Sequence, residues 1–96
     1  MKFSSKTSAS FASDFFRVTV FAPGNVKVRS LELFGTRTRS EAIHMSRNIL
    51  LEYLEQGHDA GVAELRGKGV THYVYRQAGN NNLKESSRGD FIPELI

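Results

Sequence analysis

One segment of the sequence is patterned as an amphipathic helix, and it constrains what the rest of the chain can fold into. Thr38 followed by Glu41 fits a capping box, and Gly57 fits the position just past a helix C-terminus. We expect a helix of about five turns between these signals. The residues on its apolar face are Ala42, Ser46, Ile49, Leu50, Tyr53 and Leu54, with Ile43 and Met45 at the margins. Such a helix needs a second layer against which to bury this face.

Two β-like runs precede the helix. Residues 15–22 (FFRVTVFA) alternate, so that Phe16, Val18 and Val20 point one way. Pro23-Gly24-Asn25 is a turn signal, and residues 26–34 (VKVRSLELF) form the second run, which predicts a hairpin. The alternation slips in the second run. A bulge near Arg29-Ser30 would bring its four aliphatic residues, Val26, Val28, Leu31 and Leu33, to one face.

The sequence after the helix predicts one further strand and leaves a second segment open. Residues 70–76 alternate and are rich in β-branched and aromatic residues, which indicates a strand. Residues 62–65 fit either a strand paired with it or a short helical turn. We therefore expect a single α+β domain over residues 15–76. In this two-layer ββαβ(β) arrangement, one amphipathic helix packs on one face of an antiparallel sheet of three or four strands.

Both ends of the chain are expected to lie outside this domain. Residues 1–14 are rich in Ser and lack an apolar stretch, so we expect a flexible N-terminal arm and no secretory signal. Residues 77–96 are polar and rich in Asn, Ser and Gly, which favours a disordered tail, and they end in the apolar hexapeptide FIPELI. No apolar run is long enough to span a membrane. We therefore expect a soluble, cytoplasmic protein.

Composition excludes several classes of site. The 96 residues contain no cysteine, which rules out a disulfide scaffold, thiolate metal sites and thiol catalysis. The three histidines, His44, His58 and His72, do not have the spacing of a helical metal site. Motifs for phosphate loops, dinucleotide binding or a nucleophilic serine elbow are also missing from the sequence. We therefore expect a protein that is not an enzyme and that has no metal or cofactor.

The basic and aromatic residues favour nucleic acid as the ligand. Lys and Arg total 13 against 10 for Asp and Glu, a formal net charge of +3. Cations for phosphates and rings for base stacking are expected together on the sheet face that the helix leaves uncovered. The residues expected there are Arg17, Lys27, Arg29, Tyr73 and Tyr75, with Arg37 and Arg39 near the helix start adding phosphate contacts.

A protein partner is the alternative hypothesis. The chain would then be a small regulatory or accessory adaptor or inhibitor, of the compact kind that viruses and mobile elements encode. It would bind an acidic protein surface or form a homodimer through the sheet face or the helix. The residues expected to contact such a partner are Phe15, Phe21, Arg47 and Leu51.

The strand–strand–helix run over residues 15–57 resembles, in outline, the second half of a double-stranded RNA-binding domain. It is similarly close to the hairpin-plus-helix of antitoxin and integrase arm-binding domains. The RNA-binding family has a lysine cluster at the helix start, where this chain has Thr36-Arg37-Thr38-Arg39-Ser40. The resemblance implies nucleic-acid binding in general and assigns a role to no residue here.

Overall fold

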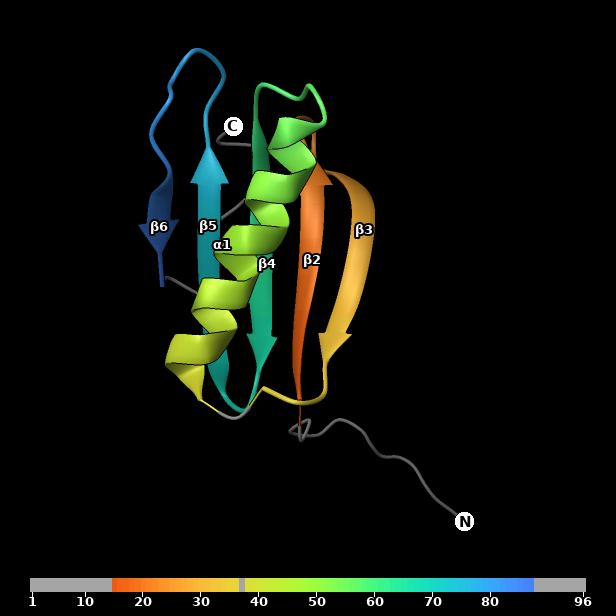
Figure 1. Cartoon of the computed structure of the whole chain (residues 1–96), viewed down its shortest axis with the longest axis vertical. Coiled ribbons are helices and arrows are strands. Elements are labelled where there is room, and N and C mark those ends of the chain that lie inside the picture. Colours follow the sequence, from red (N-terminus) through yellow and green to blue (C-terminus); the bar gives the residue numbers. More distant parts are fainter. Residues whose placement is uncertain (1–14, 37, 88–96) are drawn as a thin grey trace.

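The computed structural model describes residues 15–36 and 38–87. The expected arm at residues 1–14, Arg37 and the hexapeptide at residues 91–96 lie outside these ranges. The elements follow in the order β2 (Phe16–Ala22), β3 (Val26–Leu33), α1 (Arg39–Glu55), β4 (Gly61–Gly67), β5 (Val70–Arg76) and β6 (Lys84–Ser86). The strands form one sheet in the order β3-β2-β4-β5-β6, and all neighbours are antiparallel. Helix α1 crosses one face of this sheet diagonally (Figure 1).

The α+β fold predicted from the sequence is confirmed, one open alternative is decided, and one strand is added. Residues 62–65, which fitted either a strand or a helical turn, lie within strand β4. Strand β6 falls in the polar tail, where the sequence predicted disorder, and it brings the sheet to five strands. The resemblance to the RNA-binding domain ends at the helix, because β4 returns to the centre of the sheet and pairs with β2.

Helix α1 begins and ends at the predicted signals. The Oγ1 atom of Thr38 accepts a hydrogen bond from the Glu41 amide at 3.1 Å, and the Glu41 carboxylate accepts one from the Thr38 amide at 3.1 Å. These two bonds satisfy amides that the first turn leaves without helical partners. Gly57, just beyond the helix, has a φ of 107°, which costs little without a side chain.

In the described ranges, no helix has the length and apolar character needed to cross a membrane.

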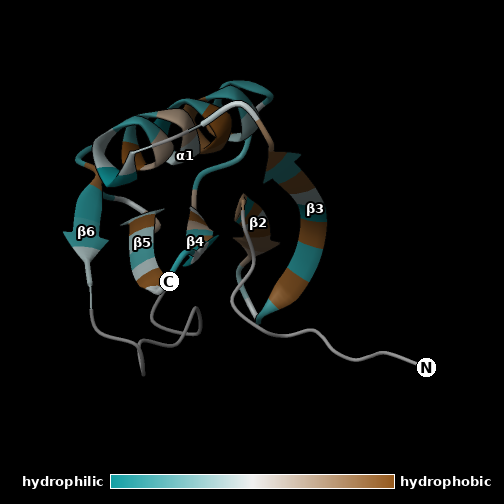
Figure 2. Ribbon diagram, turned by 90° about the horizontal axis from the view of Figure 1, so that it is seen from below, coloured by the Kyte–Doolittle hydropathy of each residue, from teal (hydrophilic) through white to brown (hydrophobic). Residues whose placement is uncertain are grey.

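The core lies between α1 and one side of the sheet, which we call the near face. Strands β2, β4 and β5 contribute Phe16, Val18, Val20, Ala63, Leu65 and Val74, and the helix contributes Ala42, Ile49, Leu50 and Leu54. Alternation along the strands sends their other side chains to the opposite side, the far face. Figure 2 shows α1 on one side of β5, β4 and β2, with β3 curving away beside it.

A bulge in β3 sets which of its side chains reach each face. Val20 lies opposite Arg29 and Phe21 lies opposite Lys27, so Val28 is the extra residue. The bulge is therefore one residue earlier than the predicted position near Arg29-Ser30. Its effect is the predicted one, because Val26, Leu31 and Leu33 lie opposite the near-face positions of β2.

Strand β6 is held by a polar cluster. His72 of β5 is buried, and its Nε2 lies 2.8 Å from the Glu85 carboxylate while its Nδ1 lies 3.1 Å from the Ser87 hydroxyl. Arg47 of α1 forms an ion pair with the same carboxylate. The Arg47 guanidinium holds the pKa of Glu85 below its usual range, and the hydrogen bond with His72 lowers it further. This cluster joins β6 to both β5 and α1.

Candidate functional site

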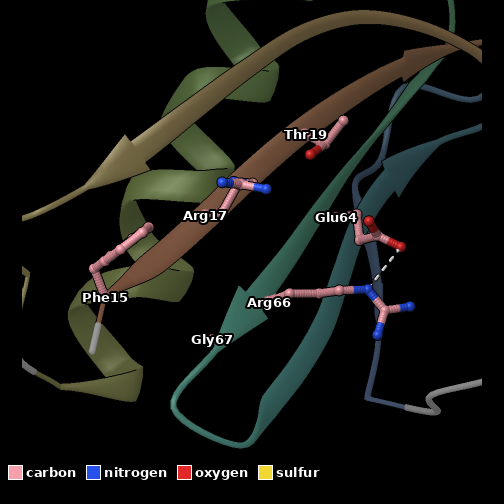
Figure 3. A pocket seen from close by; sticks show the side chains of 6 residues that line it. All are labelled: Phe15, Arg17, Thr19, Glu64, Arg66 and Gly67. Carbon is pink, nitrogen blue, oxygen red and sulfur yellow. Dashed lines mark ion pairs between the residues drawn. The ribbon is translucent and has the colours of Figure 1, made fainter. Parts of the chain in front are cut away.

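The far face carries a hollow of about 270 Å³ where strands β2 and β4 lie side by side. Phe15, Arg17 and Thr19 line it from the β2 side, and Glu64, Arg66 and Gly67 line it from β4. Figure 3 shows these side chains in front of the two strands, with α1 behind them. Cations, a carboxylate, a hydroxyl and a ring therefore meet on the side of the sheet away from the helix.

Two arginines face each other across this hollow. Arg17 and Arg66 are direct cross-strand partners on β2 and β4. Like charges opposite each other destabilise an antiparallel pair. Each guanidinium is balanced by one acid: Arg17 pairs with Glu32 at 2.6 Å and Arg66 pairs with Glu64 at 3.2 Å. Both arginine side chains remain about half exposed, at 55% and 52%, so they are accessible to an anion from solvent.

Tyr73 positions the β4 side of the hollow. Its hydroxyl donates to the Glu64 carboxylate at 3.1 Å and accepts from Arg66 at 3.0 Å. Burial raises the pKa of Tyr73, and the neighbouring Glu64 carboxylate raises it further by disfavouring a second negative charge. The neutral hydroxyl therefore bridges Glu64 and Arg66 and fixes the direction of both side chains.

The far face contains most of the predicted binding residues but not all. Arg17 and Tyr73 lie there, and Tyr75 alternates with Tyr73 on the same side of β5. Lys27 lies opposite Phe21, at the other end of β2 from the hollow. Tyr73 is only 1% exposed, so the expectation that its ring offers a stacking surface is wrong.

Arg29 was predicted on the far face and lies on the near face. The bulge at Val28 reverses the alternation before it, and Arg29 points toward the helix, where it pairs with Glu52 at 2.9 Å. Arg39 is also separate from the hollow, because it lies in the first turn of α1 and donates to the Ser87 hydroxyl at 3.4 Å. Neither arginine adds to the far-face charge.

Four lining residues were not singled out by the sequence analysis: Thr19, Glu64, Arg66 and Gly67. The segment at 62–65 was compatible with a strand or a turn. No pairing with residues 15–22 was therefore predicted for it, and Arg66, which follows it directly, was not placed opposite Arg17. A firm strand assignment there, combined with the alternation of residues 15–22, is the signal that would have placed Arg66 beside Arg17.

The residues of the protein-binding alternative do not form one surface. Phe15 lines the hollow and contacts Phe34, with ring centroids 4.8 Å apart. Phe21 is half-buried on β2, whereas Arg47 and Leu51 lie on α1 across the sheet. A single partner surface would therefore use only part of this set.

The histidines are engaged in separate local contacts. His58 stacks on Tyr53 with ring centroids 4.1 Å apart, His44 lies 3.3 Å from the Asn48 amide, and His72 belongs to the cluster that holds β6. Across residues 15–36 and 38–87, no group of three or more His, Asp or Glu side chains is placed to hold a metal ion.

Comparisons of this chain with protein families, curated proteins and solved structures gave no match.

Proposed function

We propose that this chain is a small protein that binds single-stranded nucleic acid through the far-face hollow. The observation that carries the proposal is the direct opposition of Arg17 and Arg66 on the far face of β2 and β4, with both side chains about half exposed. Two successive phosphates, one at each guanidinium, would relieve the repulsion between these cations. Arginine suits this role because its planar group forms paired hydrogen bonds with phosphate oxygens.

The other lining residues fit a nucleotide better than a bare anion. The Phe15 ring borders the hollow beside Arg17 and offers an apolar surface to a base. Glu64 and Thr19 supply oxygen acceptors for amino groups on a base edge or for a ribose hydroxyl. Because stacking on a ring requires an unpaired base, we expect a preference for single strands over duplexes.

Fluorescence anisotropy with labelled single-stranded DNA, single-stranded RNA and duplex DNA tests the proposal. If each arginine neutralises one phosphate, the slope of log K against log salt for a single strand is about −1.4. Arg17→Gln and Arg66→Gln should each weaken binding roughly tenfold or more and bring the slope to about −0.7.

Arg39→Gln is the matched control, since it removes the same charge from the helix side of the molecule. It should leave the affinity close to that of the wild type. Equal losses of affinity in all three variants would show that binding depends only on net charge, and would overturn the assignment of the hollow. Binding of acidic polypeptides such as polyglutamate, without binding of nucleic acid, would favour an acidic protein as the ligand instead.

A further inference from the structure

Strand β3 is at the edge of the sheet and is poorly covered on its helix side. It spans eight residues and pairs with β2 on one side, while no other described strand pairs with its outer side. A single helix is about as wide as two strands, so α1 covers the centre of the sheet and leaves its edges. Val26 and Val28 are accordingly 54% and 45% exposed, although they point to the side on which the core lies.

An open hollow separates β3 from the helix. Val28 and Arg29 line it from the strand, and Tyr53 and Gln56 line it from α1, together with His58; its volume is about 310 Å³. The aliphatic side of the first part of β3 thus continues into a groove, whereas Leu31 and Leu33 in its last part pack with the core. Exposed aliphatic residues along an unpaired strand edge are a typical basis for pairing with another strand.

The sequence of β3 is complementary to itself when read in the opposite direction. Its first part is Val26-Lys27-Val28 and its last part is Leu31-Glu32-Leu33, each with one charge between two aliphatic residues. The two charges are opposite in sign. Within residues 15–36 and 38–87, Lys27 forms no ion pair, whereas Glu32 pairs with Arg17 through one of its two carboxylate oxygens.

The bulge allows the two parts of β3 to pair with matching faces. In a regular strand, residues 26 and 28 would point to the side opposite residues 31 and 33. With Val28 as the extra residue, Val26 and Leu33 lie on the near face while Lys27 and Glu32 lie on the far face. The two parts of β3 therefore present the same order of faces, and one can lie antiparallel to the other with Lys27 against Glu32. Arg29, the one near-face cation of β3, points toward α1 and pairs with Glu52 there.

We propose that two copies of this chain associate through β3, paired antiparallel about a two-fold axis perpendicular to the sheet. Lys27 then lies opposite Glu32 of the second copy, and Val28 and Arg29, which share one position at the bulge, lie opposite Leu31 of the second copy. Each of these contacts occurs twice by symmetry. Charges on an edge strand usually oppose pairing, but here the matching position of the second copy holds the opposite charge. The two hollows would lie on the same side of one continuous sheet.

Sedimentation velocity over a concentration series, with nucleic acid removed, measures this association directly. The wild type should form dimers. Lys27→Glu alone and Glu32→Lys alone each place like charges opposite one another, and each should weaken self-association at least roughly tenfold. An equimolar mixture of these two variants restores both opposite-charge contacts, so it should form a heterodimer with affinity close to that of the wild type.

Lys84→Glu is the matched control, because it makes the same charge change on β6, the other edge of the described sheet. It should dimerise like the wild type. Circular dichroism checks that every variant is folded, as expected because exposed ion pairs contribute only about 0–1 kcal/mol.

Cysteine cross-linking gives a second readout that does not depend on charge. The chain has no cysteine, so the double variant Lys27→Cys/Glu32→Cys introduces the only thiols. Within one copy the two positions lie opposite Phe21 and Arg17, which places them about 13 Å apart along the strand, too far for a disulfide. Oxidation should therefore produce a covalent dimer. A wild type that stays monomeric up to about 1 mM, or a charge-variant mixture that remains monomeric, would overturn the proposal. Neither result bears on the hollow, which the nucleic-acid assay tests separately.

Discussion

Gly67 is the position at which the structure predicts the largest effect from the smallest change. It ends β4 and lines the hollow, and its φ is 141°, in a region that side chains rarely adopt. A Cβ added there would lie 2.8 Å from the Phe16 Cα and closer still to the Phe15 carbonyl oxygen. Both atoms belong to the backbone at the start of β2, so neither can move aside by changing a rotamer.

The expected cost of Gly67→Ala combines two effects. Backbone strain at such a φ costs about 1–3 kcal/mol, and overpacking against a well-packed neighbour costs about 1–3 kcal/mol. We expect a loss of about 3 kcal/mol in the free energy of unfolding, which for a domain of this size lowers the Tm by about 12–24 °C. The hollow should be disturbed as well, because the clash separates the strands that carry Arg17 and Arg66.

Thermal unfolding followed by circular dichroism measures this effect. Gly35→Ala is the matched control, since a Cβ at Gly35 meets no atom within 4 Å and its backbone needs no special φ. That variant should stay within about 0.5 kcal/mol of the wild type. If Gly67→Ala melts within a few degrees of Gly35→Ala, the close approach of β4 to the start of β2 is wrong, and so is the geometry of the hollow.

Three further predictions concern stability. Thr38→Ala removes the helix cap and should cost about 1 kcal/mol by denaturant titration, whereas Ser40→Ala in the same turn should cost little. The pKa of Glu85 is lowered in the folded protein, so its contribution to stability is present above the usual carboxyl range and is lost as pH falls through the lowered value. The difference in Tm between wild type and Glu85→Gln should therefore shrink on acidification. A difference that stays constant with pH would contradict this. The pKa of Tyr73 is raised, so its contribution is present below pH ~10 and is lost as pH rises through the higher folded value. Tyr73→Phe should cost about 1 kcal/mol at neutral pH and should abolish the latest tyrosinate absorbance step in an alkaline titration.

The features predicted correctly from the sequence depend on local patterns. The helix has its cap, its stop and its apolar period within about 20 residues, so Thr38, Gly57 and the buried face followed from the order of residues alone. Strand β6 had no such signal, because it is three residues long and is held by Glu85 through His72 and Arg47, which are distant in the sequence.

The candidate site was predicted only in part, because its residues meet across strands. The alternation of residues 15–22 placed Arg17 on the far face, but Arg66 required the register between β2 and β4. Arg29 was misplaced because a bulge moved by one residue changes the face of a single side chain. Tyr73 was assigned to the correct face, yet its burial depends on neighbours that a strand pattern does not reveal.

An NMR titration of the ¹⁵N-labelled protein with a short single-stranded oligonucleotide tests the central claim most directly, because it reports where the ligand binds. We expect the largest shifts at the backbone amides of residues 15–19 and 64–67 and at the guanidinium N–H groups of Arg17 and Arg66. Resonances of α1 should move little, since the helix lies on the other side of the sheet. Shifts confined to α1 or to β3, or no shift at low salt, would contradict the assignment of the hollow as the binding site.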